Sequence, residues 1–193
     1  MTDPLSEKDK LFLLTLARNT IEQAVNQKSL PTWDENQCSE ILKRKGASFV
    51  TLTIDGQLRG CIGTLEAYQS LVEDVRDHAR QAALEDYRFP PVTVAEVPLL
   101  RIEISRLTVP EVLKYDHPES LPQVLKPGID GVILKDGIRR ATFLPQVWQQ
   151  IPDPDEFLSH LCQKMGSPAN LWKQKMLGVC IYRVEEFQEP DRR

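Results

Sequence analysis

The stretch Leu58-Arg59-Gly60-Cys61-Ile62-Gly63 decides the fold of this chain, because it forms the second half of a predicted hairpin. It follows the apolar, β-branched run 48–54 and the pair Asp55-Gly56, the strongest short signal for a tight hairpin turn. Glycine within or just after a strand marks a bulge, or a place where another backbone or a ligand comes close. The sequence therefore predicts a hairpin strand that carries a cysteine between two glycines.

Cys61 has two interpretations. In the first it is a small buried hydrophobic residue and Gly60 is a bulge, because free cysteine is among the most buried residue types. In the second it is a nucleophile or covalent carrier, which requires a nearby cation or amide dipoles that favour the thiolate. Arg59, two positions away on the same side of an unbulged strand, is the candidate cation. Its alternative role is an ion pair that fastens the hairpin to its neighbours. Gly60 and Gly63 are candidate ligand-binding positions.

The run Leu-Arg-Gly-Cys-Ile-Gly-Thr at 58–64 resembles the signature of the AMME chromosomal-region protein family, whose bacterial and archaeal members are called AmmeMemoRadiSam system protein A. The likeness continues in order through residues 82–92, 100–107, 141–147 and 157–166. Nearly the whole chain is covered. The resemblance implies one family domain over residues 1–193, with or without a small N-terminal lobe, and it implies no settled activity.

The name of the AmmeMemoRadiSam system links this family to a Memo-like protein and a radical SAM protein. The resemblance therefore implies these two proteins as partners in a shared pathway. It also includes the turn Asp86-Tyr87-Arg88-Phe89. Asp86, Arg88 and Phe89 are candidate ligand-binding residues, because the turn can present a carboxylate and a guanidinium to a ligand. In the alternative, Asp86 caps the preceding helix and pairs with Arg88.

Composition narrows the class of protein. With 41% hydrophobic and 27% charged residues, the 193-residue chain is typical of a soluble globular domain with a real core. A net charge of −4 argues against nucleic acid as a partner, since such proteins usually carry a basic face. The four cysteines are far apart and form no Cys-x-x-Cys pair, which favours a reducing cytoplasm. No run approaches the ~20 apolar residues of a membrane span.

Periodicity and turn signals predict an α+β fold, with a mostly antiparallel sheet built from hairpins and packed with helices, and with room for a smaller second lobe. Capping boxes open helices at Thr32 and Ser70, and Asp136-Gly137 makes a second hairpin turn. The predicted helices are 6–27, 32–43, 70–85, 145–149 and 154–165. The predicted strands are 48–54, the strand after Gly56, 100–105, 132–134, 138–144 and 179–187.

Two histidines, His78 and His160, lie on predicted helices. His78 lies within the apolar stripe of helix 70–85, which favours a packed histidine at the edge of the core. His160 and Lys164 are four residues apart, beside the buried stripe of helix 154–165. They can share a cleft with Cys61, with His160 as a base and Lys164 as a ligand-binding residue. The alternative is a solvated helix face.

Two functions from different classes follow. In the first, an enzyme acts on a small molecule, with Cys61 as nucleophile, Arg59 stabilising charge and His160 as base. In the second, a non-catalytic module binds a metabolite or a partner protein. No metal site is expected, because His and Cys have no usable ligand spacing, and no cofactor fingerprint is present. Gly60-Cys61-Ile62-Gly63 follows a hairpin and joins no helices, so it is not an RNA-binding loop of the KH type.

Overall fold

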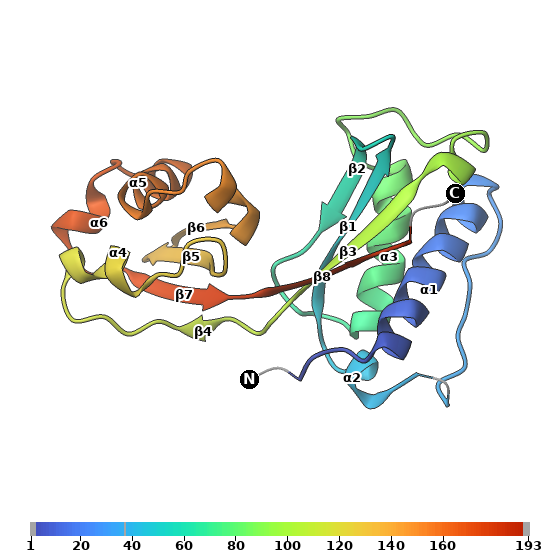
Figure 1. The fold of residues 1–193 in the computed structure, drawn as a ribbon, viewed down its shortest axis with the longest axis horizontal. Helices are drawn as coiled ribbons and strands as arrows, with labels where there is room; N and C mark the ends of the chain where they lie inside the picture. The colour runs from blue at the N-terminus through green and yellow to red at the C-terminus, as the bar shows by residue number, and fades with distance from the viewer. Residues whose placement is uncertain (1–2, 37, 191–193) are drawn as a thin grey trace. The chain divides into compact units, whose positions relative to one another are not determined.

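The chain folds into two compact units in this computed structural model, which describes residues 3–36 and 38–190 (Figure 1). Unit 1 comprises Met1–Thr108 and Glu185–Arg193, and unit 2 comprises Val109–Val184. Each unit has its own four-stranded sheet and its own hydrophobic core. The α+β class with antiparallel hairpins and packed helices is confirmed. The single family domain over residues 1–193, with or without a small N-terminal lobe, stays a prediction. The division into two units sets apart residues 109–184.

The sheet of unit 1 has the strand order β2-β1-β3-β8. Its hairpin turns at Asp55 and Gly56, which have φ angles of 50° and 77°. Two positive φ angles are the signature of the type I′ turn, whose twist matches that of the flanking strands. β3 pairs antiparallel with the other side of β1, so β2 is left at one edge. The strands are β1 (Ala47–Ile54), β2 (Gln57–Gly63), β3 (Arg101–Leu107) and β8 (Val184–Gln188).

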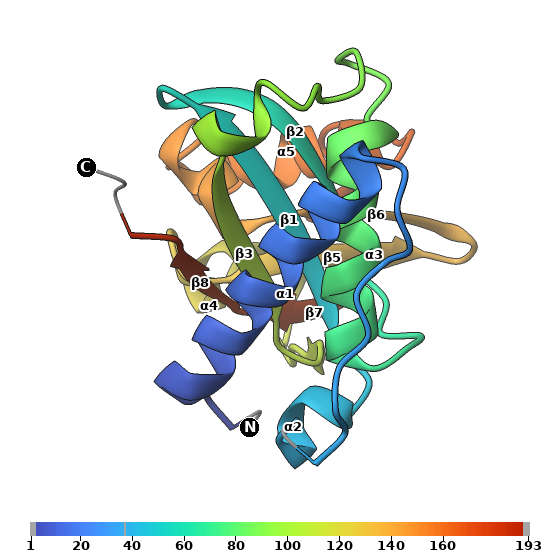
Figure 2. The ribbon, with the colours of Figure 1, turned by 90° about the vertical axis from the view of Figure 1, so that its right-hand side faces the viewer.

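Two helices, α1 (Glu7–Val25) and α3 (Leu71–Leu84), cover one face of this sheet, as the view in Figure 2 shows. Both begin with a complete capping box, from Ser6 to Asp9 and from Ser70 to Glu73. Each box satisfies backbone donors that the first helical turn leaves without partners. The predictions for these two helices are confirmed to within two residues.

The predicted start of helix 32–43 is wrong, because among the described residues 32–36 and 38–43 only α2 (Glu40–Lys43) is helical. The Asp34 carboxylate accepts a hydrogen bond of 2.9 Å from the backbone N–H of Asn36. Such a turn gives the backbone an alternative to the helix. The Ser39 side chain, at the N-cap of α2, donates to Asp9 at 2.6 Å and so ties this segment to α1.

A buried polar network joins α3 to β1. The Ser48 hydroxyl donates to Asp74 Oδ2 at 2.6 Å, and His78 Nδ1 lies 3.1 Å from the same oxygen. All three residues are almost completely shielded from solvent, with exposed fractions of 0% for Ser48 and Asp74 and 3% for His78. His78 is therefore a packed histidine, as its place in the apolar stripe predicted.

Unit 2 is built around a second hairpin, and its sheet has the order β4-β7-β5-β6. Trp148 stacks on Phe157 with 3.6 Å between ring centroids, at the centre of its core. The strands are β4 (Glu111–Val112), β5 (Gly131–Asp136), β6 (Arg139–Phe143) and β7 (Gly178–Tyr182). The helices are α4 (Leu121–Val124), α5 (Pro154–Lys164) and α6 (Leu171–Gln174), with 3-10 turns at Pro118–Ser120 and Pro145–Gln149.

The predicted strand 179–187 is two strands in different units. β7 ends at Tyr182 in the sheet of unit 2, and β8 starts at Val184 and joins the sheet of unit 1. The run of apolar residues on both faces at 179–182 is typical of a central strand, and β7 indeed lies between β4 and β5. The same residue pattern contains no signal that the chain changes sheets at Arg183.

Candidate functional site

A β-bulge decides where the Cys61 side chain points. The register between β1 and β2 shifts after the pair Leu52 and Gly60, so that Arg59 is the extra residue. The bulge therefore lies at Arg59 and not at Gly60. Gly60 faces α3, and Cys61 consequently points to the opposite face of the sheet, where it pairs with Thr51. The Thr51 hydroxyl lies 3.2 Å from the Cys61 sulfur.

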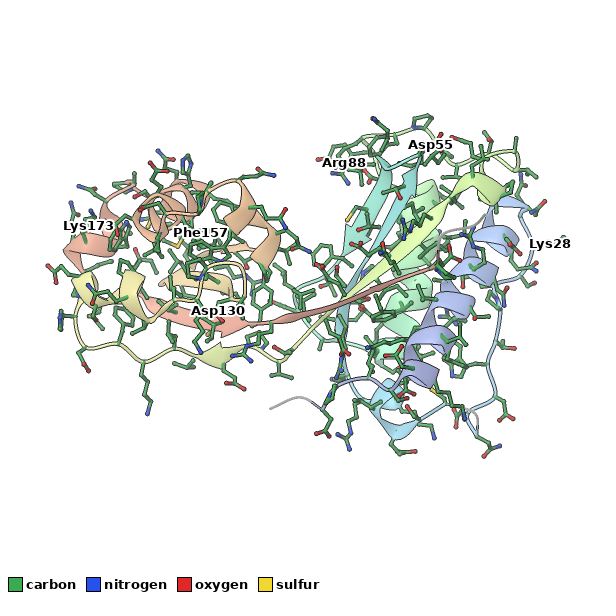
Figure 3. The ribbon with its side chains drawn as sticks, viewed as in Figure 1. Lys28, Asp55, Arg88, Asp130, Phe157 and Lys173 are labelled. Atoms are coloured by element: carbon green, nitrogen blue, oxygen red, sulfur yellow. The ribbon has the colours of Figure 1, made fainter. Side chains whose placement is uncertain are left out.

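The main chain of Cys61 is held from outside the sheet by Asp86 and Arg88. Its N–H donates to Asp86 Oδ2 at 2.8 Å, and its carbonyl accepts from Arg88 Nη2 at 3.0 Å. Arg88 also forms a bidentate pair with the Asp86 carboxylate, at 2.9 and 2.6 Å. Figure 3 labels Arg88 beside β2. An edge strand presents unpaired backbone groups, and these two side chains replace the missing neighbour strand at Cys61.

The charges of this clamp stabilise one another. The hydrogen bonds from Arg88 hold the pKa of Asp86 well below its usual range, against the opposing effect of burial, and the Cys61 N–H contributes in the same direction. A carboxylate that accepts several hydrogen bonds strongly prefers the ionised form. Asp86 and Arg88 thus form the pair that the alternative interpretation of this turn predicted, and the pair also positions Cys61.

Arg59 binds a different carboxylate. Its guanidinium pairs with Glu96 at 2.8 Å and donates to the Pro90 carbonyl at 2.9 Å. Hydrogen bonds from Arg59 and, to a smaller extent, from Thr93 lower the pKa of Glu96 to about 2. The ion pair fastens β2 to residues 90–96, as the alternative role of Arg59 predicted. Charge stabilisation at Cys61 by Arg59 stays a prediction.

Both glycines of the motif are in close contact with protein atoms. A Cβ atom at Gly60 would lie 2.2 Å from the Ala82 carbonyl oxygen of α3. At Gly63 it would lie 2.4 Å from the Ser48 carbonyl oxygen. Any side chain at Gly60 would push β2 away from α3, since the obstacle is backbone. These contacts account for both glycines, and a ligand-binding role for either stays a prediction.

The remaining candidates lie in two places. Phe89 is half-buried, and the Arg88 guanidinium lies 5.5 Å from its ring centroid. His160 and Lys164 belong to unit 2, where both are exposed on α5. Lys164 donates to the Thr142 carbonyl at 2.9 Å, which covers the edge of β6. Their predicted roles beside Cys61 stay predictions.

Within residues 3–36 and 38–190, no group of three or more His, Cys, Asp or Glu side chains is arranged to hold a metal ion. None of the helices in those ranges combines the length and the apolar character that a membrane span needs.

The comparisons with known proteins decide the family. The family model AMMECR1 matches residues 14–187. The chain belongs to the AMMECR1 family. The resemblance carried by the hairpin strand and the later segments is thereby confirmed. The matched range includes both the Cys61 strand and the Asp86–Arg88 clamp. These two segments are separated in the AMMECR1 domain sequence and meet in one site in the fold.

AMMECR1 relatives cover this chain almost completely. Protein MJ0810 of Methanocaldococcus jannaschii is 37% identical over 194 residues, which cover 98% of this chain and 94% of that protein. Protein TK0174 of Thermococcus kodakarensis is 37% identical over 186 residues, covering 92% and 89%. The crystal structure of the uncharacterized protein PH0010 from Pyrococcus horikoshii matches with a TM-score of 0.81 and 34% identity, covering 96% and 93% of the two chains. The Pyrococcus horikoshii structure shares the fold, and the names of all three proteins state no activity.

Sequence reasoning does not find two residues of the site. Thr51 escapes it because an unbulged hairpin places Thr51 opposite Gly60 rather than Cys61. Glu96 escapes it because its partner Arg59 lies 37 positions earlier in the chain. The one signal that points to the bulge is Arg59 itself, since an unbulged strand would turn its guanidinium toward the core beside Leu52.

Proposed function

We propose that the protein is an enzyme that acts on a small molecule through Cys61 as nucleophile or covalent carrier. The observation that carries the proposal is the place of the thiol: it is half-buried on the sheet face opposite α1 and α3, beside the Thr51 hydroxyl. Cys38 and Cys162, in contrast, are packed into the two hydrophobic cores. A packed structural cysteine needs no hydroxyl partner outside the core.

The clamp supports the same proposal. Asp86 and Arg88 fix the Cys61 main chain from both its N–H and its carbonyl, so the sulfur occupies a defined position before any ligand binds. The Arg88 guanidinium also places a positive charge at the Cys61 carbonyl.

The test is a search for covalent adducts. The purified protein is incubated with a small-molecule extract, and the Cys61 peptide is analysed by mass spectrometry. We expect an added mass on Cys61 that is absent from the Cys61→Ser variant and still present in Cys180→Ser, the matched control, because Cys180 is also half-buried but lies on β7. Turnover of an extract component that is unchanged in Cys61→Ser would contradict the proposal.

A second candidate function is a binding module that works with a Memo-like protein and a radical SAM protein. The observation that favours it is the exposed turn beside the clamp. Tyr87 is 95% exposed, next to the partly exposed Arg88. Tyrosine and arginine are enriched among the residues that dominate binding energy at protein interfaces.

Tyr87→Ala tests this candidate without disturbing the clamp, because the contacts to Cys61 come from Asp86 and Arg88. We expect the affinity for the partner to fall by roughly tenfold or more, in a binding titration with each of the two proteins. Ile138→Ala is the control, since Ile138 is an equally exposed hydrophobic residue at the hairpin turn of unit 2. Equal affinities of the wild type and Tyr87→Ala would remove this turn from the interface.

A further inference from the structure

A row of three side chains crosses the sheet of unit 1 and includes the Cys61 thiol. Thr51 on β1 pairs with Cys61 on β2 and, on its other side, with Glu103 on β3. All three side chains point away from α1 and α3, because the alternate residues Leu52 and Ile104 lie in the core. Adjacent strands are about 4.8 Å apart, so a small molecule over Thr51 lies within reach of both the thiol and the carboxyl group.

Glu103 has an unusual environment for a glutamate. Its side chain is partly buried, and its charged neighbours are Glu186 on β8 and Arg101 two residues earlier on β3. Burial and the negative charge of Glu186 raise the pKa of Glu103, while Arg101 opposes them. A glutamate with a raised pKa holds its proton closer to neutral pH. Such a group can donate a proton in one step and take one back in the next.

We propose that Glu103 is the proton donor that works with Cys61, an inference that rests on the nucleophilic role proposed for that thiol. The substrate class is a small electrophile whose leaving group is a basic anion, such as a thiolate or an alkoxide. The Cys61 thiolate attacks the electrophilic atom, and the new bond to sulfur forms as the bond to the leaving group breaks. The leaving group takes the proton of the Glu103 carboxyl group, which becomes a carboxylate.

In this step both the nucleophile and the proton donor belong to unit 1. The sequence assigned acid–base chemistry to His160, which is on α5 of unit 2. Glu103, in contrast, is tied to Cys61 by the registers of two strand pairs within one sheet. The carboxylate left after the step recovers its proton from the next thiol or water that enters the site.

Two disulfide reagents separate the proton donor from the nucleophile. Dithiodipyridine releases a weakly basic leaving group, whereas hydroxyethyl disulfide releases a strongly basic thiolate. Both are attacked by the same Cys61 thiolate, so its ionised fraction cancels in the ratio of the two rates. We expect Glu103→Gln to lower the rate with hydroxyethyl disulfide relative to dithiodipyridine by about tenfold or more. The mixed disulfide on Cys61 is quantified by mass spectrometry.

Two control variants and two possible outcomes distinguish the role of Glu103 from the role of Cys61. Glu22→Gln removes the same charge from an exposed position on α1 and is expected to leave the ratio unchanged. In the wild type, the rate with hydroxyethyl disulfide relative to dithiodipyridine is expected to fall as the pH rises and Glu103 loses its proton. Glu186→Gln is expected to shift this fall to lower pH, because it removes a charge that raises the pKa of Glu103. A ratio that is equal in wild type and Glu103→Gln, with Cys61 still reactive, overturns the role of Glu103 alone. Cys61 that reacts with neither disulfide in the native protein overturns the nucleophilic role as well.

Discussion

Iodoacetamide is expected to modify Cys61 before the other three cysteines of the native protein. Cys38 and Cys162 have exposed fractions of only 4% and 0%, and burial raises the pKa of both thiols. They are therefore poorly accessible and mostly protonated near neutral pH. Since the thiolate is the reactive form, we expect both to react at least about tenfold more slowly than Cys61. Cys180 is the relevant competitor, because it is half-buried as well.

A timed reaction with mass-spectrometric mapping of each cysteine peptide measures this order. In Cys61→Ser the fast phase should disappear while the slower labelling of Cys180 continues. Arg88→Gln should slow the modification of Cys61, because it removes one of the two side chains that fix the position of the Cys61 main chain. If Cys61 is labelled only after denaturation, it is a packed residue and the nucleophile hypothesis is wrong.

The largest loss of stability is expected from Asp74→Ala in the buried network of unit 1. This change removes the shared partner of the Ser48 hydroxyl and of His78, both of which are shielded from solvent. Buried polar groups that lose their partner carry the full cost of their lost hydration. We expect the free energy of unfolding to fall by about 2–4 kcal/mol. Chemical denaturation followed by the helical circular dichroism signal measures the loss.

Asp77→Ala is the matched control on the same helix. Asp77 pairs with Arg76 at 3.0 Å, but its side chain is 30% exposed. An exposed ion pair contributes only about 0–1 kcal/mol, so this variant should unfold close to the wild type. If the two aspartate variants lose equal stability, the network does not hold α3 on β1.

The residue types alone were sufficient to predict turns and helix ends, which depend on contacts between residues close together in the sequence. The turn Asp55-Gly56 needs two positive φ angles, and Ser6 and Ser70 satisfy the first backbone donors of their helices. Gly166, with a φ of 74°, ends the helix predicted over 154–165. Each of these features is a contact within a few positions, so the residue types alone indicate it.

Two predicted elements were wrong because distant contacts decide them. The capping signal at Thr32 competes with the turn at Asp34, and Ser39, the N-cap residue of α2, is held by its hydrogen bond to Asp9 of α1. The run 179–187 has strand character throughout, but its two halves pair with different sheets. Strand propensity does not specify which neighbour a strand pairs with.

The sequence by itself determined that a cysteine lies on a hairpin strand between two glycines, and that the strand is followed by the turn Asp86-Tyr87-Arg88-Phe89. It did not determine on which face the thiol lies. Without a bulge, a turn at Asp55-Gly56 pairs Cys61 with Val50, whose side chain is in the core. The bulge at Arg59 moves the register by one residue and turns Cys61 to the opposite face, because the Arg59 guanidinium binds Glu96 outside the core. Only the tertiary structure supplies that partner, and with it the position of the thiol.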